Sequence, residues 1–285
     1  MSFDIRPAWL FVPGDRPDRY AKAAERSDIA IVDLEDAVSP ADKESARQAV
    51  RDAATGADGA APLLDPARTV IRVNAVDTEH YAGDAQLLAD LPFTMVMLPK
   101  AESAEGPARL AADLPDVQLI ALIETPAGAV NAAEIAAQPN VAGLMWGSED
   151  LIAALGGGSS RGKDGSYRAV AMHVRSQTLL AAKAHGKWAL DSIWTAIDDV
   201  DGLAEEALDA VESGFDAKVS IHPKHVPVVR SAYAPSAEQT RWAQEVLAAA
   251  EGQKGAFSFE GSMIDAPLLA HARAIQVRAA ATADA

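Results

Sequence analysis

Eight short apolar runs recur along the chain, and most of them are apolar at every position instead of at every second position. They lie at residues 9–13, 29–36, 69–74, 95–100, 119–124, 141–150, 188–193 and 217–222. Continuously apolar strands are typical of a parallel sheet that is covered on both faces. The pattern therefore predicts eight parallel strands in the protein core.

Segments of helical length separate most of these runs. One covers residues 17–26, and another begins at Ser39, where a proline follows at the first helical position. Others cover residues 103–113, 168–185 and 200–213. This alternation predicts a (β/α)8 TIM barrel. An open, doubly wound sheet is disfavoured because the glycine-rich coenzyme fingerprint after the first strand is absent.

More than 50 residues follow the eighth strand. They include a predicted helix at residues 236–251, a glycine-containing link and an apolar segment around Met263 and Ile264. We expect residues 1–230 to form the catalytic barrel and residues 231–285 to form a C-terminal helical extension. An apolar segment beyond a closed barrel is expected to pack on a neighbouring subunit or to act as a lid over the mouth of the barrel.

Composition narrows the class of protein. The 285 residues include 25 basic and 41 acidic side chains, and the resulting net charge of −16 argues against a surface for nucleic acid or anionic membranes. A local basic pocket remains compatible with this charge. There is no cysteine, which excludes disulfides and thiolate chemistry. We see neither a secretion signal nor an apolar run of about 18 residues, so a cytoplasmic protein is expected.

Ionisable residues concentrate where the predicted strands end. In a TIM barrel these ends meet at the carboxyl-terminal face, which carries the catalytic residues. A single polar residue there is equally well explained by the return of the chain to water. As a set, however, Arg72, Glu124 and Asp150 point to function. The strand ends read Pro13-Gly14-Asp15, Glu35-Asp36, Arg72-Val73-Asn74, Pro99-Lys100, Glu124-Thr125, Glu149-Asp150, Asp191-Ser192 and His222-Pro223.

Glu124 and Asp150 are the predicted metal ligands. If their strands are neighbours, both carboxylates emerge at one edge of the sheet, close enough to hold one hard divalent cation. Two carboxylates with substrate oxygens and water suit Mg²⁺, and Mn²⁺ is an alternative. Such an ion binds an α-keto or α-hydroxy carboxylate and stabilises developing negative charge, which Arg72 can share.

Lys100 has two interpretations. It could form a Schiff base, but acids at Glu35, Asp36 and Glu124 would keep it protonated, and an ammonium is a poor nucleophile. We therefore interpret Lys100 as a partner of these carboxylates.

Six short motifs give the chain a resemblance to the citrate lyase beta-subunit and malyl-CoA lyase family, within the wider HpcH/HpaI aldolase grouping. They occur in the family's order, and the resemblance extends over nearly the whole chain. They are LFVPG at residues 10–14, VDLED at 32–36, IRVN at 71–74, MLPK at 97–100, IET at 123–125 and GSEDL at 147–151.

The resemblance implies a role for each matching residue. Glu124 and Asp150 match magnesium ligands, Arg72 matches the active-site arginine, and Glu35 and Asp36 match an acidic pair that binds the metal's waters. Phe11, Arg16 and Lys22 match positions that contact coenzyme A. Asp265, in the segment at residues 257–267, matches an aspartate that reaches into a neighbouring subunit's site. The assembly implied is a homotrimer or a hexamer formed from two trimers.

The resemblance implies a magnesium-dependent carbon–carbon lyase that splits a 3-hydroxyacyl-CoA thioester, such as malyl-, citramalyl- or citryl-CoA, into an acyl-CoA and a 2-oxo acid. Three alternatives stay open. They are a coenzyme-independent aldolase acting on free 2-keto acids, a beta subunit that works only within a multi-subunit citrate lyase, and a non-catalytic barrel. A hydrolytic step that releases free acid from the thioester also remains open.

Several residues have simple structural interpretations. Arg16 and Lys22 could be solvated side chains on a helix, and Asp265 could cap a helix that begins before Pro267. His222 could contact coenzyme A or serve a structural role, whereas Trp146 is expected to be a packing or surface residue. The glycine-rich residues 155–165 predict a mobile loop beside Asp150, in which Arg161 either neutralises a carboxylate or is exposed.

Overall fold

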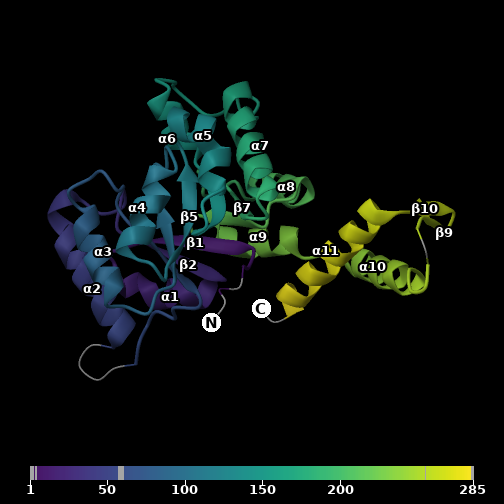
Figure 1. Cartoon of the computed structure of the whole chain (residues 1–285), viewed down its shortest axis with the longest axis horizontal. Coiled ribbons are helices and arrows are strands. Elements are labelled where there is room, and N and C mark those ends of the chain that lie inside the picture. Colours follow the sequence, from purple (N-terminus) through teal and green to yellow (C-terminus); the bar gives the residue numbers. More distant parts are fainter. Residues whose placement is uncertain (1–2, 4, 57–60, 254, 284–285) are drawn as a thin grey trace.

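The computed structural model describes residues 3, 5–56, 61–253 and 255–283. Eight parallel strands close into a barrel in sequence order, because the first strand also pairs with the eighth. The predicted (β/α)8 TIM barrel is therefore confirmed (Figure 1). The strands are β1 (Ala8–Pro13), β2 (Ile29–Asp33), β3 (Thr69–Arg72), β4 (Met95–Leu98), β5 (Gln118–Ile123), β6 (Val141–Trp146), β7 (Trp188–Asp191) and β8 (Ala217–Ser220).

The continuous apolar character of the strands follows from burial on two sides. Along β2, Ile29 and Ile31 point into the barrel, whereas Ala30 and Val32 pack under the surrounding helices, and all four are at most 1% exposed. Alternate residues of one strand thus enter two different apolar layers. Because both layers need apolar side chains, these strands lack the alternation of polar and apolar residues that is typical of a half-exposed strand.

Helices surround this barrel and connect successive strands. The helix predicted from Ser39 is divided, with a 3₁₀ turn at Pro40–Asp42 before the α-helix begins at Lys43. Residues 53–66, rich in alanine, glycine and aspartate, are predicted from the sequence to form a surface loop. This segment lies partly outside the described residues, and residues 53–55 are instead the end of a helix. The helices are α1 (Tyr20–Arg26, after a 3₁₀ turn at Pro17–Arg19), α2 (Lys43–Thr55), α3 (Tyr81–Ala89), α4 (Glu105–Asp113), α5 (Pro126–Ala136), α6 (Ser148–Ala154), α7 (Ala169–Ala184), α8 (Val200–Ser213) and α9 (His225–Tyr233).

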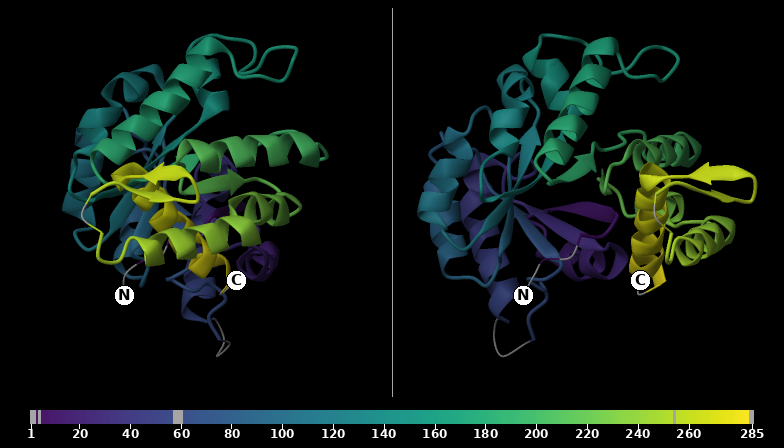
Figure 2. Two further views of the ribbon diagram at one scale, coloured as in Figure 1. Left: turned by 90° about the vertical axis from the view of Figure 1, so that its right-hand side faces the viewer. Right: turned by 45° about the vertical axis from the view of Figure 1, so that its right-hand side comes forward.

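The C-terminal extension projects from one side of the barrel (Figure 2). It contains α10 (Ala237–Ala249), a hairpin of β9 (Phe257–Phe259) and β10 (Ser262–Ile264), and α11 (Ala266–Ala283). Ser236 caps α10 through a reciprocal pair of hydrogen bonds with Gln239, which fixes the predicted helix start. A separate apolar cluster joins α10 to α11 and the hairpin, so the extension has its own small core.

The division of the chain at residue 230 stays a prediction. Within the described residues, no helix is both long enough and apolar enough to cross a membrane.

Candidate active site

Arg72 is the last residue of β3, and it is paired directly with Asp33, the last residue of β2. The guanidinium makes two parallel hydrogen bonds to the Asp33 carboxylate, with Nε–Oδ1 at 2.7 Å and Nη2–Oδ2 at 2.6 Å. Its Nη1 lies 3.1 Å from Glu35, and the Phe11 ring lies beneath it at 4.8 Å. Burial alone would lower the pKa of Arg72, but the charge and hydrogen bonds of Asp33, together with the charges of Glu35 and Glu124, outweigh this and raise it. The arginine is therefore a fixed, permanently charged group.

Asp33 was missed as a site residue by the sequence reasoning, which chose the two acids that follow it. The register between β2 and β3 selects Asp33, because it lies directly opposite Arg72. A search for opposite charges at the ends of neighbouring strands could have found it.

Lys100 lies on the other side of Glu35. Its ammonium forms a hydrogen bond with Glu35 and lies 3.6 Å from Asp36. Burial lowers the pKa of Lys100, but the hydrogen bond and charge of Glu35 more than offset this and raise it. A protonated lysine agrees with a role as partner of the carboxylates and argues against a Schiff base.

Glu124 follows β5 and is only 2% exposed. The backbone N–H of Lys100 donates to its Oε1 at 2.9 Å, which orients the carboxylate. Burial, followed by the negative charge of Asp150, raises the pKa of Glu124 to about 8. Gly147 is required beside it, since a Cβ there would lie 2.9 Å from the Glu124 Cβ. The two predicted metal ligands therefore share one electrostatic environment.

Asp150 lies in the first turn of α6, directly after β6, which pairs with β5. The neighbouring Glu149 instead accepts hydrogen bonds from Ser148 and from Ser160, at 3.0 and 2.7 Å. Glu149 is therefore used to hold the following loop, whereas Asp150 is available to a ligand.

The acidic and basic residues at this end of the barrel form a charged centre. We define it as Asp33, Glu35, Asp36, Arg72, Lys100, Glu124 and Asp150. Its carboxylates outnumber its cations, which favours the binding of a further cation. No group of three or more potential metal ligands is present among the described residues. Two carboxylates with free positions nevertheless fit a hard ion that completes its coordination with water and substrate.

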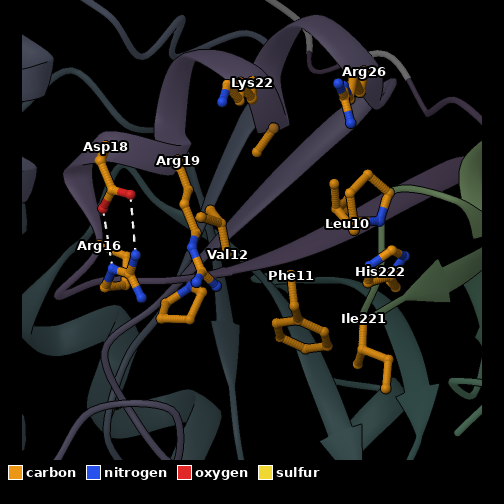
Figure 3. Close-up of a pocket in the computed structure, with 13 residues that line it drawn as sticks. Leu10, Phe11, Val12, Arg16, Asp18, Arg19, Lys22, Arg26, Ile221 and His222 are labelled. Atoms are coloured by element: carbon orange, nitrogen blue, oxygen red, sulfur yellow. Dashed lines mark hydrogen bonds and ion pairs between the residues drawn. The ribbon is translucent and has the colours of Figure 1, made fainter. Parts of the chain in front are cut away.

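A basic cavity of about 530 Å³ lies beside β1 and α1 (Figure 3). It brings together Phe11, Arg16 and Lys22, which the resemblance links to coenzyme A. Arg16 is held by Asp18 through two hydrogen bonds of 3.0 Å. The complete lining is Leu10, Phe11, Val12, Pro13, Arg16, Asp18, Arg19, Lys22, Ala23, Arg26, Ile221, His222 and Pro223.

Arg19 and Arg26 also line the basic cavity and were not singled out from the sequence. With Arg16 and Lys22 they recur at intervals of three or four residues, the spacing of one helix face. That spacing could have identified them. His222 lines the same cavity, and its Nδ1 accepts the backbone N–H of Lys224 at 3.2 Å, which leaves Nε2 as the free ring nitrogen.

Asp265 lies between β10 and α11, in the part of the extension that is distant from the barrel (Figures 1 and 2). Its carboxylate accepts the backbone N–H of Leu268 at 3.4 Å, a weak helix cap. A single chain therefore does not bring Asp265 to its own charged centre. Its predicted place in a neighbouring subunit's site stays a prediction.

The glycine-rich loop after α6 contacts neighbouring elements, and its predicted mobility stays a prediction. Arg161 forms an ion pair of 2.5 Å with Glu206 on α8. Its guanidinium lies between the rings of Tyr167 and Trp194, at 3.7 and 4.3 Å. Together with the bond from Ser160 to Glu149, these contacts join the loop to α6 and α8.

A second, buried ionic network links β7 and β8 to the helices α7 and α8. The Lys218 ammonium is fully buried and contacts Asp191 at 3.0 Å and Glu206 at 2.9 Å. Asp191 also accepts hydrogen bonds from Arg175 and from the indole of Trp146. Trp146 is fully buried, so of its two expected roles, packing or surface, the structure shows packing. This network connects the barrel to α7 and α8, so Asp191 serves structure.

Comparison with known proteins gives consistent matches. The family profile of HpcH/HpaI aldolase/citrate lyase matches residues 8–223. A citrate lyase subunit beta-like protein from Mycobacterium tuberculosis is 54% identical over 273 residues, which cover 96% of this chain and 95% of that protein. A (3S)-malyl-CoA thioesterase from Cereibacter sphaeroides is 34% identical over 85% of this chain and 82% of its own length.

A crystal structure of the M. tuberculosis protein CitE, in complex with magnesium, acetoacetate and coenzyme A, superimposes with a TM-score of 0.85. The two chains are 54% identical, with 96% of this chain and 98% of that one covered. The family profile and these relatives each extend over most of the chain. The protein therefore belongs to the HpcH/HpaI aldolase/citrate lyase family, as the six sequence motifs predicted.

Proposed function

We propose that the protein is a magnesium-dependent carbon–carbon lyase that cleaves a 3-hydroxyacyl-CoA thioester into an acyl-CoA and a 2-oxo acid. The observation that carries this proposal is the position of Glu124, Asp150 and Arg72 at one end of the barrel, where Phe11 of the basic cavity contacts Arg72. The charged centre would bind the carboxylate end of such a substrate, and the basic cavity would bind the phosphates of its coenzyme A end.

The relatives support both ligands. The structure of M. tuberculosis CitE contains magnesium, acetoacetate and coenzyme A. In this chain, Glu124 and Asp150 would hold Mg²⁺, with Mn²⁺ as an alternative. The basic cavity would bind coenzyme A as part of the substrate. When bound, the ion supplies positive charge that lowers the pKa of the substrate hydroxyl.

We assign the successive steps of the reaction to residues of the protein. A carboxylate takes the proton of the substrate hydroxyl, and we assign this role to Asp265 of an adjacent subunit. The carbon–carbon bond then breaks, so that the hydroxyl carbon becomes the carbonyl of the 2-oxo acid and the electron pair passes to the thioester as an enolate. Protonation of that enolate at carbon gives the acyl-CoA.

Arg72 would bind the enolate oxygen. A guanidinium carries five N–H groups, of which Asp33 accepts two, and Nη1 lies 3.1 Å from Glu35. The remaining donors and the fixed charge would stabilise negative charge on the substrate. Glu35 contacts both Arg72 and Lys100, and Asp36 adds a further carboxylate beside Lys100.

Purified protein alone should be assayed with Mg²⁺ and malyl-, citramalyl- and citryl-CoA, with separate measurement of 2-oxo acid and free thiol. Release of 2-oxo acid without free thiol is the expected result for one of the three. Reaction of free keto acids and aldehydes alone would identify the coenzyme-independent aldolase instead. No reaction with any substrate would point to missing partner subunits of a citrate lyase.

Hydrolysis of the thioester is a second candidate. The malyl-CoA thioesterase from C. sphaeroides favours it, because that relative is 34% identical over most of the chain. Free thiol released in the same assay, without 2-oxo acid, would support the hydrolase.

A further inference from the structure

Lys43, the first residue of α2, is only 7% exposed, although lysine is among the residues that proteins rarely bury. Its ammonium donates hydrogen bonds to the carbonyl oxygens of Leu34 and Glu35, both at 2.7 Å. These two carbonyls belong to the loop that joins β2 to α2, and this loop carries Glu35 and Asp36. The buried lysine is thus bound to the main chain of a segment of the charged centre.

The same loop is also held from other directions. Asn74 donates to the Leu34 carbonyl at 2.9 Å. The carboxylate of Asp33 accepts the backbone N–H groups of Glu35 and Ala37, at 2.8 and 3.0 Å. Lys43 differs from these anchors because it holds two carbonyl oxygens of the loop at once and carries a positive charge next to several carboxylates.

We propose that Lys43 is a positioning residue for the lyase reaction, which clamps the β2–α2 loop so that the Glu35 side chain stays aligned with Arg72 and Lys100. The inference rests on the proposed function. Lys43 acts through two main-chain carbonyls and Glu35, and it does not contact the substrate. The Glu35 carboxylate contacts Arg72 at 3.1 Å and binds Lys100, so displacement of the loop would take this carboxylate away from both cations.

Amide hydrogen exchange tests the clamp without any substrate. Lys43→Met keeps an unbranched side chain and removes the ammonium. The amides of Glu35 and Ala37 should then exchange at least about 10-fold faster, because the loop opens more often. Strands on the opposite side of the barrel, such as β6, should change far less. Unchanged exchange in the loop, or an equal increase in every strand, would overturn the proposal.

Arg230→Met is the matched control. Arg230 on α9 makes a partly buried ion pair of 2.7 Å with Asp28, and it has no contact with the β2–α2 loop. Its loss also removes one cation and some stability. Exchange of Glu35 and Ala37 should stay at the wild-type rate in this variant once the change in global stability is taken into account.

Kinetics test the consequence for catalysis. Lys43→Met should lower kcat on the order of 10- to 100-fold, the scale expected for misplaced catalytic groups. The KM for the thioester should change less than about 2-fold, because the basic cavity does not include the β2–α2 loop. The double variant Lys43→Met/Glu35→Gln should be little slower than Glu35→Gln alone. Additive losses would show that Lys43 does not act through Glu35.

Chemical rescue tests whether the positive charge of Lys43 is needed or only the volume of its side chain. Because the chain contains no cysteine, Lys43→Cys introduces a single thiol. Alkylation of the unfolded chain with 2-bromoethylamine, followed by refolding, restores an ammonium at nearly the length of lysine. Alkylation with iodoacetamide adds a neutral amide instead. Recovery of kcat and slow exchange with the first reagent only is expected, whereas equal recovery with both would contradict the proposal.

The two proposals can fail separately. If the wild-type protein cleaves no thioester, the proposed function fails, and hydrogen exchange still decides whether Lys43 clamps the loop. If the wild-type protein is active and Lys43→Met keeps the wild-type kcat, the clamp has no catalytic role and the proposed function stands.

Discussion

The charged centre and the basic cavity differ in how firmly their side chains are held. In the charged centre, Arg72 has a side-chain exposure of 11% and Glu124 a residue exposure of only 2%, although Lys100 and Asp36 at its edge are 37% and 56% exposed. In the basic cavity, the side chains of Arg16 and Asp18 are 44% and 62% exposed. Buried, cross-linked charges keep one geometry, whereas exposed charges contribute little individually and are screened by salt. Arg72 and Glu124, which we propose to act where the bond breaks, are therefore fixed, whereas the exposed cations of the basic cavity can adjust.

The largest expected effect is the loss of a predicted metal ligand. Glu124→Ala or Asp150→Ala should lower the rate on the order of 10³-fold or more, which corresponds to about 4 kcal/mol of transition-state stabilisation. Titration calorimetry with Mg²⁺ should show the matching loss of binding. Glu134→Ala, an exposed carboxylate on α5, is the control. Persistent metal-dependent activity in both variants would remove the metal assignment.

Asp265→Ala should lower the rate by about 10²- to 10³-fold, the range expected for a general base. The charged centre of each chain would then be incomplete without its neighbour. Mixing inactive Asp265→Ala and Arg72→Ala proteins under subunit exchange should restore activity, because some sites would contain both intact residues. Exchange demonstrated by mass spectrometry without recovered activity would argue against a shared site and against the predicted trimer or hexamer geometry.

Arg72→Lys should lower kcat on the order of 10²-fold, since it keeps the charge and loses the parallel bonds to Asp33. The KM for the thioester should change little. Steady-state kinetics separate the two parameters, and a variant with wild-type kcat would show that the rigid geometry of the charged centre is unnecessary.

The smallest effects are expected in the basic cavity. Arg16→Ala and Lys22→Ala should each raise the KM for the CoA thioester by roughly 2- to 5-fold, with kcat unchanged, because exposed ion pairs are worth about 1 kcal/mol or less. Added salt should reduce the difference from the wild type. A thioester of pantetheine, which lacks the nucleotide, should show no difference between variants. An effect of similar size with pantetheine would place coenzyme A elsewhere.

The barrel could be predicted closely from the sequence because its strands are apolar on both faces and are separated by helices. Glu124, Asp150 and Arg72 could be proposed as site residues from the sequence for a related reason, since strand ends in a parallel barrel meet at one face. Asp33 was overlooked, although its charge at the end of the strand next to that of Arg72 is a signal in the sequence. The contacts of Lys43 could not be predicted, because they are made to main-chain carbonyls of a loop, which leave no pattern in the sequence.

The C-terminal extension shows a different limit of prediction from the sequence. Its helix at α10 could be predicted from the cap at Ser236. The place of Asp265, however, depends on contacts between chains, and neither the spacing of residues nor one isolated chain determines them.

A crystal grown with Mn²⁺ and coenzyme A would test the central comparison most directly. The account predicts one anomalous peak within bonding distance of Glu124 and Asp150, with the coenzyme phosphates against Arg16, Arg19 or Lys22. A peak bound by other carboxylates, or a coenzyme outside the basic cavity, would contradict the assignment of the charged centre and the basic cavity to the two ends of one substrate.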